Sequence, residues 1–367
     1  MLDTAIVGAG LCGLALAHGL KGRGGRMAVY EARNRIGGRI LSQATQPGGT
    51  PLDLGPTWYW PNSQPRITRL VADLGLESFL QQDGEEVLHL KAGGEAPVPL
   101  KPGPIHDGAR RVSGGMARVV HALAQTLGPN ELQLEHVLKA VVNQGDHVEL
   151  HFLHGYEPRI VRARQVVLAV PPRVLEEGVQ FTPALDGRMR SLMRATPTWM
   201  AGSAKALASF EHPFWQEDGH TGNAFVTHAQ AVLSETFDAG DAPRHQAALG
   251  GFLALAPALR ESFRSGLPML VRSQLTQIFG TAAEGCSPLI QDWASECYTA
   301  TPLDHTLPDG HPEYGQRPLR LAHWNDKLYF GSSETAAYGG GYMEGALEAA
   351  GRILHGLALD RALMELT

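Results

Sequence analysis

The chain has 367 residues, which is long for one hydrophobic core and favours two domains. Hydrophobic residues at 43% and charged residues at 19% are typical of globular proteins, and a formal charge of −6 argues against a nucleic-acid or anionic-membrane partner. Cys12, Cys286 and Cys297 argue against a disulfide framework. The first predicted strand begins too close to Met1 for a cleaved signal peptide, so we expect a cytoplasmic protein without a membrane anchor.

The N-terminal segment combines a strand, a glycine turn and a helix. The apolar run 5–7 predicts a strand, and VGAGLCGL then places Gly8, Gly10 and Gly13 before residues with helical spacing. Gly8 allows the turn, Gly10 lets the backbone approach a pyrophosphate, and Gly13 lets the helix pack close to the strand. A second strand ends at Glu31, whose carboxylate is placed to bind a ribose. The pattern predicts dinucleotide binding and leaves NAD, NADP and FAD open.

The next segments extend beyond a generic dinucleotide unit. The stretch 34–40, NRIGGRI, has two glycines and offers Arg39 to a phosphate or a flavin edge. A second glycine-bearing turn, LDLGPTW, covers 52–58, and a helix is predicted around 67–74. The stretch 85–110 is rich in Gly and Pro, so we expect an excursion from the first domain with little helix.

The middle of the chain predicts strands. A helix is expected over 117–127, and alternating apolar and polar residues predict an antiparallel meander over 134–142, 147–153 and 159–164. The run 166–170 is apolar without alternation, which predicts a strand buried on both faces that returns to a central parallel sheet.

The second half predicts a substrate domain and a return to the first domain. A strand is expected over 200–210 and a helix over 267–279. The strand 327–331, a glycine-rich loop and a helix over 343–357 repeat the layout of the N-terminal segment. A second helix N-terminus would therefore point at the same crevice.

Six stretches spread over nearly the whole chain belong together by order and spacing. They are VGAGLCGL with Glu31, RIGGR, LDLGPTW, VVLAVPP, the segment from Lys205 to Trp215, and FGSSETAAYGGGYMEGALEAAGR. Together they resemble the flavin-containing amine oxidase family, which includes monoamine and polyamine oxidases. The resemblance implies an α/β fold, with a Rossmann-like FAD-binding domain built from discontinuous segments and an α+β substrate domain with a mixed sheet. It assigns 1–80, 111–175 and 322–367 to the FAD-binding domain, and 81–110 and 176–321 to the substrate domain.

The C-terminal match favours FAD over NAD. By resemblance, the residues that hold FAD are Gly8, Gly10, Gly13, Glu31, Arg39, Gly55, Trp58, Val137, Gly331, Glu334 and Met343. Many monoamine oxidases bind the flavin covalently through a cysteine, and that position is Pro302 here. Cys297 is displaced from it by five residues, so we expect non-covalent FAD.

Three residues match catalytic positions of the family. Lys205 precedes Pro-Phe-Trp by the interval that separates the family's active-site lysine from the same motif, and that lysine holds a water against the flavin and assists oxygen chemistry. The alternative is a strand lysine that reaches solvent. Trp293 matches a tryptophan ahead of the flavin-contacting loop, with a core aromatic as its alternative, and Tyr342 matches one wall of an aromatic cage. The other wall of the substrate pocket aligns with Leu303, and Gly339 replaces a frequent Trp, so half of the aromatic sandwich is missing.

The resemblance implies an FAD-dependent oxidase that converts a primary or secondary amine to an imine, reduces O2 and produces H2O2. Two alternatives stay open: a desaturase or dehydrogenase of a C–C or ring bond, similar to protoporphyrinogen oxidase, and an FAD-binding redox partner without turnover. The family's long helical insertion is reduced here to the Gly/Pro stretch, so the pocket entrance is expected to differ. No histidine has a metal-binding spacing, and the loop around His311 is expected to be solvated or to touch substrate.

Overall fold

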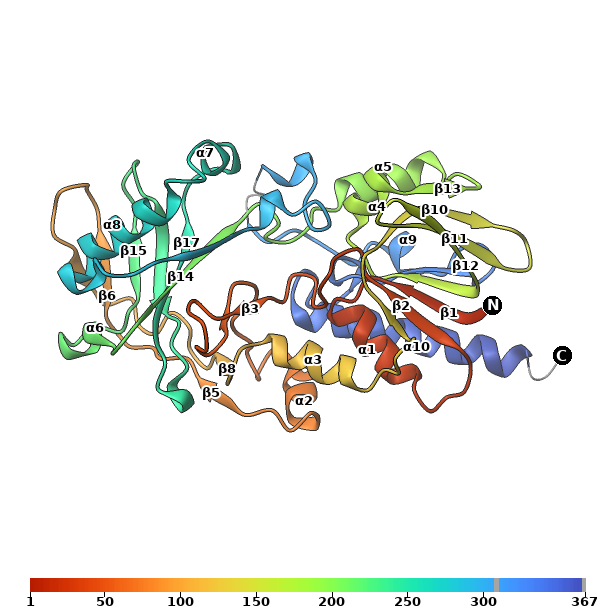
Figure 1. The fold of residues 1–367 in the computed structure, drawn as a ribbon, viewed down its shortest axis with the longest axis horizontal. Coiled ribbons are helices and arrows are strands. Elements are labelled where there is room, and N and C mark those ends of the chain that lie inside the picture. The colour runs from red at the N-terminus through yellow and green to blue at the C-terminus, as the bar shows by residue number, and fades with distance from the viewer. Residues whose placement is uncertain (307–309, 365–367) are drawn as a thin grey trace.

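The computed structural model describes residues 1–306 and 310–364, and in it the chain forms two large sheets at opposite ends of the molecule (Figure 1). The first sheet has the order β13-β10-β11-β12-β1-β2-β9, with β19 also beside β12. Its strands are β1 (Leu2–Val7), β2 (Met27–Tyr30), β9 (Leu132–Gln133), β10 (His136–Asn143), β11 (Val148–His154), β12 (Glu157–Leu168), β13 (Gln180–Thr182) and β19 (Leu328–Phe330). The α/β class with a largely parallel first sheet is confirmed.

The second sheet is mixed, as expected, and has the order β18-β14-β17-β16-β15-β6-β7. Its strands are β6 (Val87–Leu90), β7 (Val98–Leu100), β14 (Ala204–Phe210), β15 (Ala224–Val226), β16 (Leu233–Asp238), β17 (Ala247–Leu253) and β18 (Leu289–Asp292). Two short pairs complete the strands: β3 (Ser42–Gln43) with β4 (Leu52–Asp53), and β5 (Ser78–Leu80) with β8 (Arg110–Val112).

The helices cover both sheets. They are α1 (Leu11–Leu20), α2 (Pro65–Asp73), α3 (Ala117–Gln125), α4 (Pro172–Gly178), α5 (Gly187–Ala195), α6 (Phe214–Glu217), α7 (Pro257–Ser262), α8 (Leu267–Phe279), α9 (Arg317–Arg320) and α10 (Met343–Met364). Among the described helices, none is both long and apolar enough to cross a bilayer.

Both faces of the first sheet are buried. Ile6 of β1 packs in a cluster with α1, α3 and α10, whereas its neighbours Ala5 and Val7 pack in a cluster on the opposite face that includes Met189 and Met193 of α5. Successive side chains of a strand point to opposite faces, so a strand covered on both sides has an unbroken apolar run. This arrangement explains the unalternated sequence of β1.

Strand β12 corrects one prediction. We expected separate strands over 159–164 and 166–170, but a single strand runs from Glu157 to Leu168. Its first half pairs antiparallel with β11, and its second half pairs parallel with β1 and β19. The exposed half shows alternation and the buried half does not, so one strand has two different sequence patterns.

The chain leaves the first sheet twice and returns to it twice. The Gly/Pro-rich stretch contributes β6 and β7, and β6 pairs parallel with β15 of the second sheet. After β12, the chain stays with the first sheet beyond the predicted boundary at 175, because β13 pairs with β10. In Figure 1, α4 and α5 also lie over the first sheet. The domain boundaries themselves stay predictions.

One face of the second sheet packs against its own helix, and the other face packs against the N-terminal segment. Helix α8, which has the predicted bounds, packs Val271 and Leu275 against one face. On the other face, Leu207 and Phe237 cluster with Leu52 and Leu54 from the N-terminal segment. This second face is the one that borders the site described next.

Candidate active site

A cavity of about 810 Å³ is lined by residues from both sheets. From the first sheet and its loops it receives the glycine turn, Glu31 and Val137. From the second sheet it receives Lys205 of β14 and Phe252 of β17. The cavity therefore joins the predicted dinucleotide-binding residues to the predicted catalytic lysine.

The glycines of the turn have different roles. Gly8 has a φ of +101°, and a Cβ there would lie 2.5 Å from the carbonyl oxygen of Ala169. A Cβ on Gly13 would lie 2.0 Å from the Gly8 carbonyl oxygen, so Gly13 permits helix–strand contact and does not line the cavity. Gly10 faces open space, with only the Gly37 carbonyl at 3.9 Å, and no side chain caps the α1 N-terminus. The first-turn N–H groups of α1 are thus available to an anion.

Glu31 lies at the cavity end of β2, where it is buried. Its Oε2 accepts a hydrogen bond of 2.8 Å from Ala9 N, and its Oε1 accepts one of 3.0 Å from Arg33 N. These bonds fix the carboxylate and the glycine turn together. A carboxylate has about four acceptor positions, so capacity remains for ribose hydroxyls.

Arg39, which is partly exposed, and the buried Glu334 form an ion pair at the junction of three chain segments. Arg39 Nη1 lies 2.7 Å from Glu334 Oε1, and Arg39 Nη2 donates to Ser333 Oγ at 3.0 Å. Trp199 N donates to Glu334 Oε1 at 3.4 Å, and Arg39 Nη1 donates to the Trp199 carbonyl at 3.3 Å. Arg39 and Trp199 line the cavity, whereas Glu334 lies behind them with 0% exposure.

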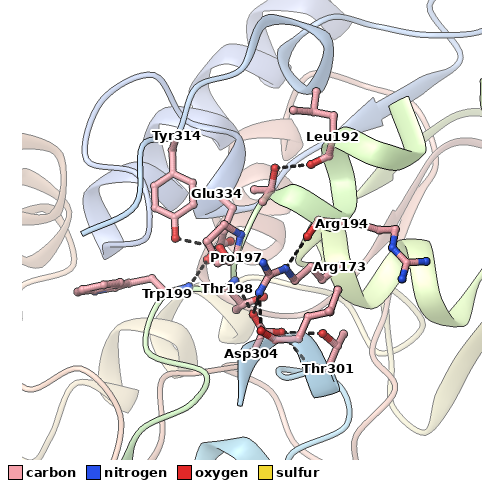
Figure 2. Close-up of polar contacts among 12 residues, drawn as sticks. Arg173, Leu192, Arg194, Pro197, Thr198, Trp199, Thr301, Asp304, Tyr314 and Glu334 are labelled. Carbon is pink, nitrogen blue, oxygen red and sulfur yellow. Dashed lines mark hydrogen bonds and ion pairs between the residues drawn. The ribbon is translucent and has the colours of Figure 1, made fainter. Parts of the chain in front are cut away.

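A second polar cluster holds the segment that crosses between the sheets (Figure 2). The buried Asp304 accepts hydrogen bonds from Arg173 Nη1 at 2.7 Å and from Thr198 N at 3.0 Å. It also accepts bonds of 2.9 Å from the backbone and hydroxyl of Thr301. On the other side, Tyr314 Oη donates to the Pro197 carbonyl at 2.9 Å. The backbone on the N-terminal side of the Trp199 ring is therefore fixed from several elements.

Lys205 is buried in β14 with 4% exposure, which excludes the alternative of a strand lysine that reaches solvent. Its Nζ donates to the Gly55 carbonyl at 2.5 Å, to Thr57 Oγ1 at 2.6 Å and to the Asp53 carbonyl at 3.3 Å. It also lies 5.2 Å from the Phe252 ring centroid. Burial lowers the pKa of Lys205 to about 7, so charged and neutral forms both exist near neutral pH.

Aromatic rings form part of the cavity wall. Trp293 is buried and donates Nε1–H to the Leu54 carbonyl at 3.1 Å. Tyr342 is 40% exposed and stacks on His311, with centroids 4.9 Å apart and an interplanar angle of 2°. The Trp199 ring lies 6.3 Å from Tyr342. Trp199 was not predicted as a wall residue, since it lies in no motif of the chain, and His311 packs behind Tyr342 outside the lining.

The structure brings most of the predicted site residues to one cavity. Those that line it are Gly8, Gly10, Glu31, Arg39, Gly55, Trp58, Val137, Lys205, Trp293, Tyr342 and Met343. Gly13, Gly331, Glu334 and Leu303 lie outside the lining. A Cβ on Gly331 would lie 2.6 Å from Ile353 Cδ1, so Gly331 permits α10 to pack on the sheet. The Leu303 side chain is 46% exposed, away from the cavity where we expected it.

Comparison with known proteins identifies the family of the chain. Residues 11–109 and 102–353 match the family described as flavin containing amine oxidoreductase. The chain belongs to this family. It is 24% identical to amine oxidase [flavin-containing] B of Sus scrofa over 463 aligned positions, which cover 97% of this chain and 86% of the pig protein. The Homo sapiens enzyme of the same name is also 24% identical, with the same coverages.

Solved structures of similar proteins share the fold. A mutant of putrescine oxidase superposes with a TM-score of 0.80 at 23% identity, covering 98% of this chain and 99% of that chain. Cyclohexylamine oxidase from Brevibacterium oxydans superposes with a TM-score of 0.78 at 20% identity and the same coverages.

The family implies a flavin cofactor, and three features of the cavity fit one. Ser332 Oγ lines the cavity and is buried without a hydrogen-bond partner among the described residues. Two helices, α1 and α10, begin at the cavity, α10 with Met343 in its wall. Gly10 leaves open the space that a side chain would fill. An anionic, hydroxyl-rich dinucleotide matches these donors.

Proposed function

We propose that the chain is an FAD-dependent amine oxidase. It would oxidise the C–N bond of a primary or secondary amine to an imine, with O2 as electron acceptor and H2O2 as product. The observation that carries this proposal is the buried Lys205 amine, held inside the cavity that the dinucleotide-binding residues line. A solved putrescine oxidase of similar fold, described as bound to putrescine, adds support for an amine.

The cofactor would be held without a covalent bond. The N-terminus of α1 and the turn at Gly8 and Gly10 bind the pyrophosphate, Glu31 binds the adenosine ribose, and Val137 contacts the adenine. Pro302 occupies the position of the family's flavin-binding cysteine and lines the cavity. When bound, FAD supplies the electron-accepting chemistry, and the protein supplies geometry and charge.

Lys205 provides the charge. Its three acceptors, the carbonyls of Asp53 and Gly55 and the Thr57 hydroxyl, fix Nζ in place before any substrate arrives. In its charged form the ammonium stabilises negative charge that develops beside it when O2 is reduced. Because the ammonium is already in place and need not move when the charge develops, a single buried cation has a large effect on the rate of O2 reduction.

The aromatic wall receives the amine. Tyr342 and Trp199 line the cavity, and an aromatic ring attracts an ammonium group placed over its face. Trp58 and Phe252 line the cavity on the Lys205 side, and there they exclude water. A desolvated amine loses its proton more readily, so no side-chain base is required.

An anaerobic panel of aryl, aliphatic, polyamine and amino-acid substrates tests the proposal. We expect at least one amine to bleach the flavin absorbance, and air to restore it with stoichiometric H2O2. Bleaching by a cyclic or polyene compound, with no response to any amine, would instead support the desaturase alternative. A stoichiometric flavin that no compound bleaches would support a redox partner without turnover.

A further inference from the structure

Glu235 is a charged residue in the active-site region that the proposed reaction does not use. It lies on β16, and its backbone pairs with Phe252 of β17, which in turn pairs with Lys205 of β14. Residues paired across neighbouring strands point to the same face of a sheet. Lys205, Phe252 and Glu235 therefore form one row across three strands on the face that borders the cavity.

The row runs outward from the catalytic lysine. Neighbouring strands lie about 4.8 Å apart, so Glu235 begins roughly 10 Å from Lys205 along the row. Phe252, between them, lines the cavity, whereas Glu235 lies one strand beyond the lining. The Glu235 side chain is 29% exposed, so its carboxylate is partly buried and still open to solvent.

No lysine or arginine among the described residues lies within ion-pair distance of the Glu235 carboxylate. Among residues 1–306 and 310–364, its one ion-pair contact is His106, with Nε2 3.6 Å from Oε1. Burial lowers the pKa of His106, so that ring is neutral near pH 7 and does not pair with Glu235 as a cation. Burial also raises the pKa of Glu235, while Lys205 lowers it. A partly desolvated carboxylate of this kind gains from a cation brought to it.

Aromatic rings connect the two ends of the row. Trp58 lines the cavity and stacks on His106, with centroids 4.5 Å apart, and it lies 6.4 Å from the Phe252 ring. An alkyl chain that extends from Lys205 toward Glu235 would cross Phe252 and pass beside Trp58. The row thus offers an apolar middle with a carboxylate at its outer end.

From this arrangement we propose that Glu235 binds the distal cationic group of the substrate, so that the preferred substrates are α,ω-diamines or amines with a second positive charge. The inference rests on the proposed amine chemistry for the near end of the substrate. The distal ammonium pairs with Glu235, the alkyl chain packs on Phe252, and the amine to be oxidised lies on the Lys205 side. Glu235 is then a specificity-determining residue and takes no part in the chemical step.

Binding of matched amines to the FAD-loaded protein tests this role. Unbranched diamines and monoamines of equal chain length are compared in the wild type, Glu235→Gln and Glu211→Gln. Glu211 is an exposed glutamate just after β14, so its substitution controls for net charge. The dissociation constant comes from the concentration dependence of anaerobic flavin reduction, or from calorimetry where an amine binds without reducing the flavin.

We expect diamines to bind about ten- to a hundredfold more tightly than matched monoamines, as one charged hydrogen bond predicts. Glu235→Gln should abolish this preference, leave monoamine binding unchanged and keep the maximal reduction rate, while Glu211→Gln keeps the preference. Equal binding of diamines and monoamines by the wild type, or an undiminished preference in Glu235→Gln, would overturn the inference. Failure of every amine to reduce the flavin would contradict the proposed function alone, because the binding comparison still decides the role of Glu235.

Discussion

Replacing Arg39 with methionine would leave the Glu334 carboxylate buried without its cation. Glu334 is 0% exposed, and Arg39 contacts its two oxygens at 2.7 and 3.1 Å. The contacts that would remain are the Ser333 hydroxyl at 3.0 Å and the long bond from Trp199 N at 3.4 Å. Breaking a buried ion pair by removing one partner costs about 3–5 kcal/mol. We therefore expect Arg39→Met to lower the free energy of unfolding by about 3 kcal/mol, since Arg39 keeps some exposure.

The pair Arg66 and Glu344 is a matched control. Glu344 is also 0% exposed, but its carboxylate accepts backbone bonds from Arg66 N at 2.9 Å and Ile67 N at 3.1 Å. The Arg66 side chain is 47% exposed, and without it the Glu344 carboxylate would still accept the backbone bonds of the α2 N-terminus. Arg66→Met should thus cost no more than about 1 kcal/mol.

Urea unfolding measures the coupling free energy between Arg39 and Glu334. It compares four proteins: the wild type, Arg39→Met, Glu334→Gln, and the double variant with both substitutions. The double variant should be more stable than Arg39→Met, because neutralising Glu334 removes the buried charge. FAD content should fall in Arg39→Met, since Arg39 and Trp199 line the cavity. A loss below 1 kcal/mol in Arg39→Met, or strict additivity in the double variant, would refute the reasoning.

Three further predictions concern Lys205 and the cofactor. Lys205→Met should slow flavin reoxidation by O2 about a hundredfold in stopped-flow measurements, with FAD still bound, because one preorganised charge is lost. Burial lowers the folded-state pKa of Lys205 to about 7 from 10.5, so between these values the unfolded state binds more protons. The free energy of unfolding of the wild type, measured against that of Lys205→Met, should therefore rise with pH between these two values. Plots of the urea-derived unfolding free energy against pH that run parallel for the two proteins would contradict this. Acid precipitation should release all FAD into the supernatant from the wild type and from Cys297→Ser alike.

Local rules singled out the glycine turn and Glu31, which the structure brings to one cavity. The glycine turn and Glu31 follow from what a pyrophosphate and a ribose require of a backbone, so their spacing is visible in the chain. The bounds of α8 were also predicted, because its 13 residues contain no Gly and its apolar residues recur at helical spacing. The family resemblance then identified Lys205, which chain-local physics alone would have left as an ordinary strand lysine.

Long-range contacts explain what was missed. Trp199 and His311 meet Tyr342 only after the chain has crossed between sheets, so no local periodicity marks them. The row from Lys205 to Glu235 depends on the register of three strands that are neighbours in the sheet, although β14 lies two strands before β16 in the sequence. Register is set by the buried face and the turns, and a single sequence does not specify it across such a distance.

The glycine run 339–341 shows how this chain rebuilds an aromatic wall that its sequence motifs lack. With Leu303 and Gly339 at the expected aromatic positions, half of the sandwich around Tyr342 was predicted to be missing. A Cβ on Gly341, whose φ is +80°, would lie 2.8 Å from Trp199 Cβ, and one on Gly340 would lie 2.6 Å from Tyr314 Cβ. The glycines thus leave the space into which rings from two other segments pack. Because Glu334 and Asp304 hold the backbone at Trp199 and Thr198, the Trp199 part of the wall depends on polar contacts far from it in sequence.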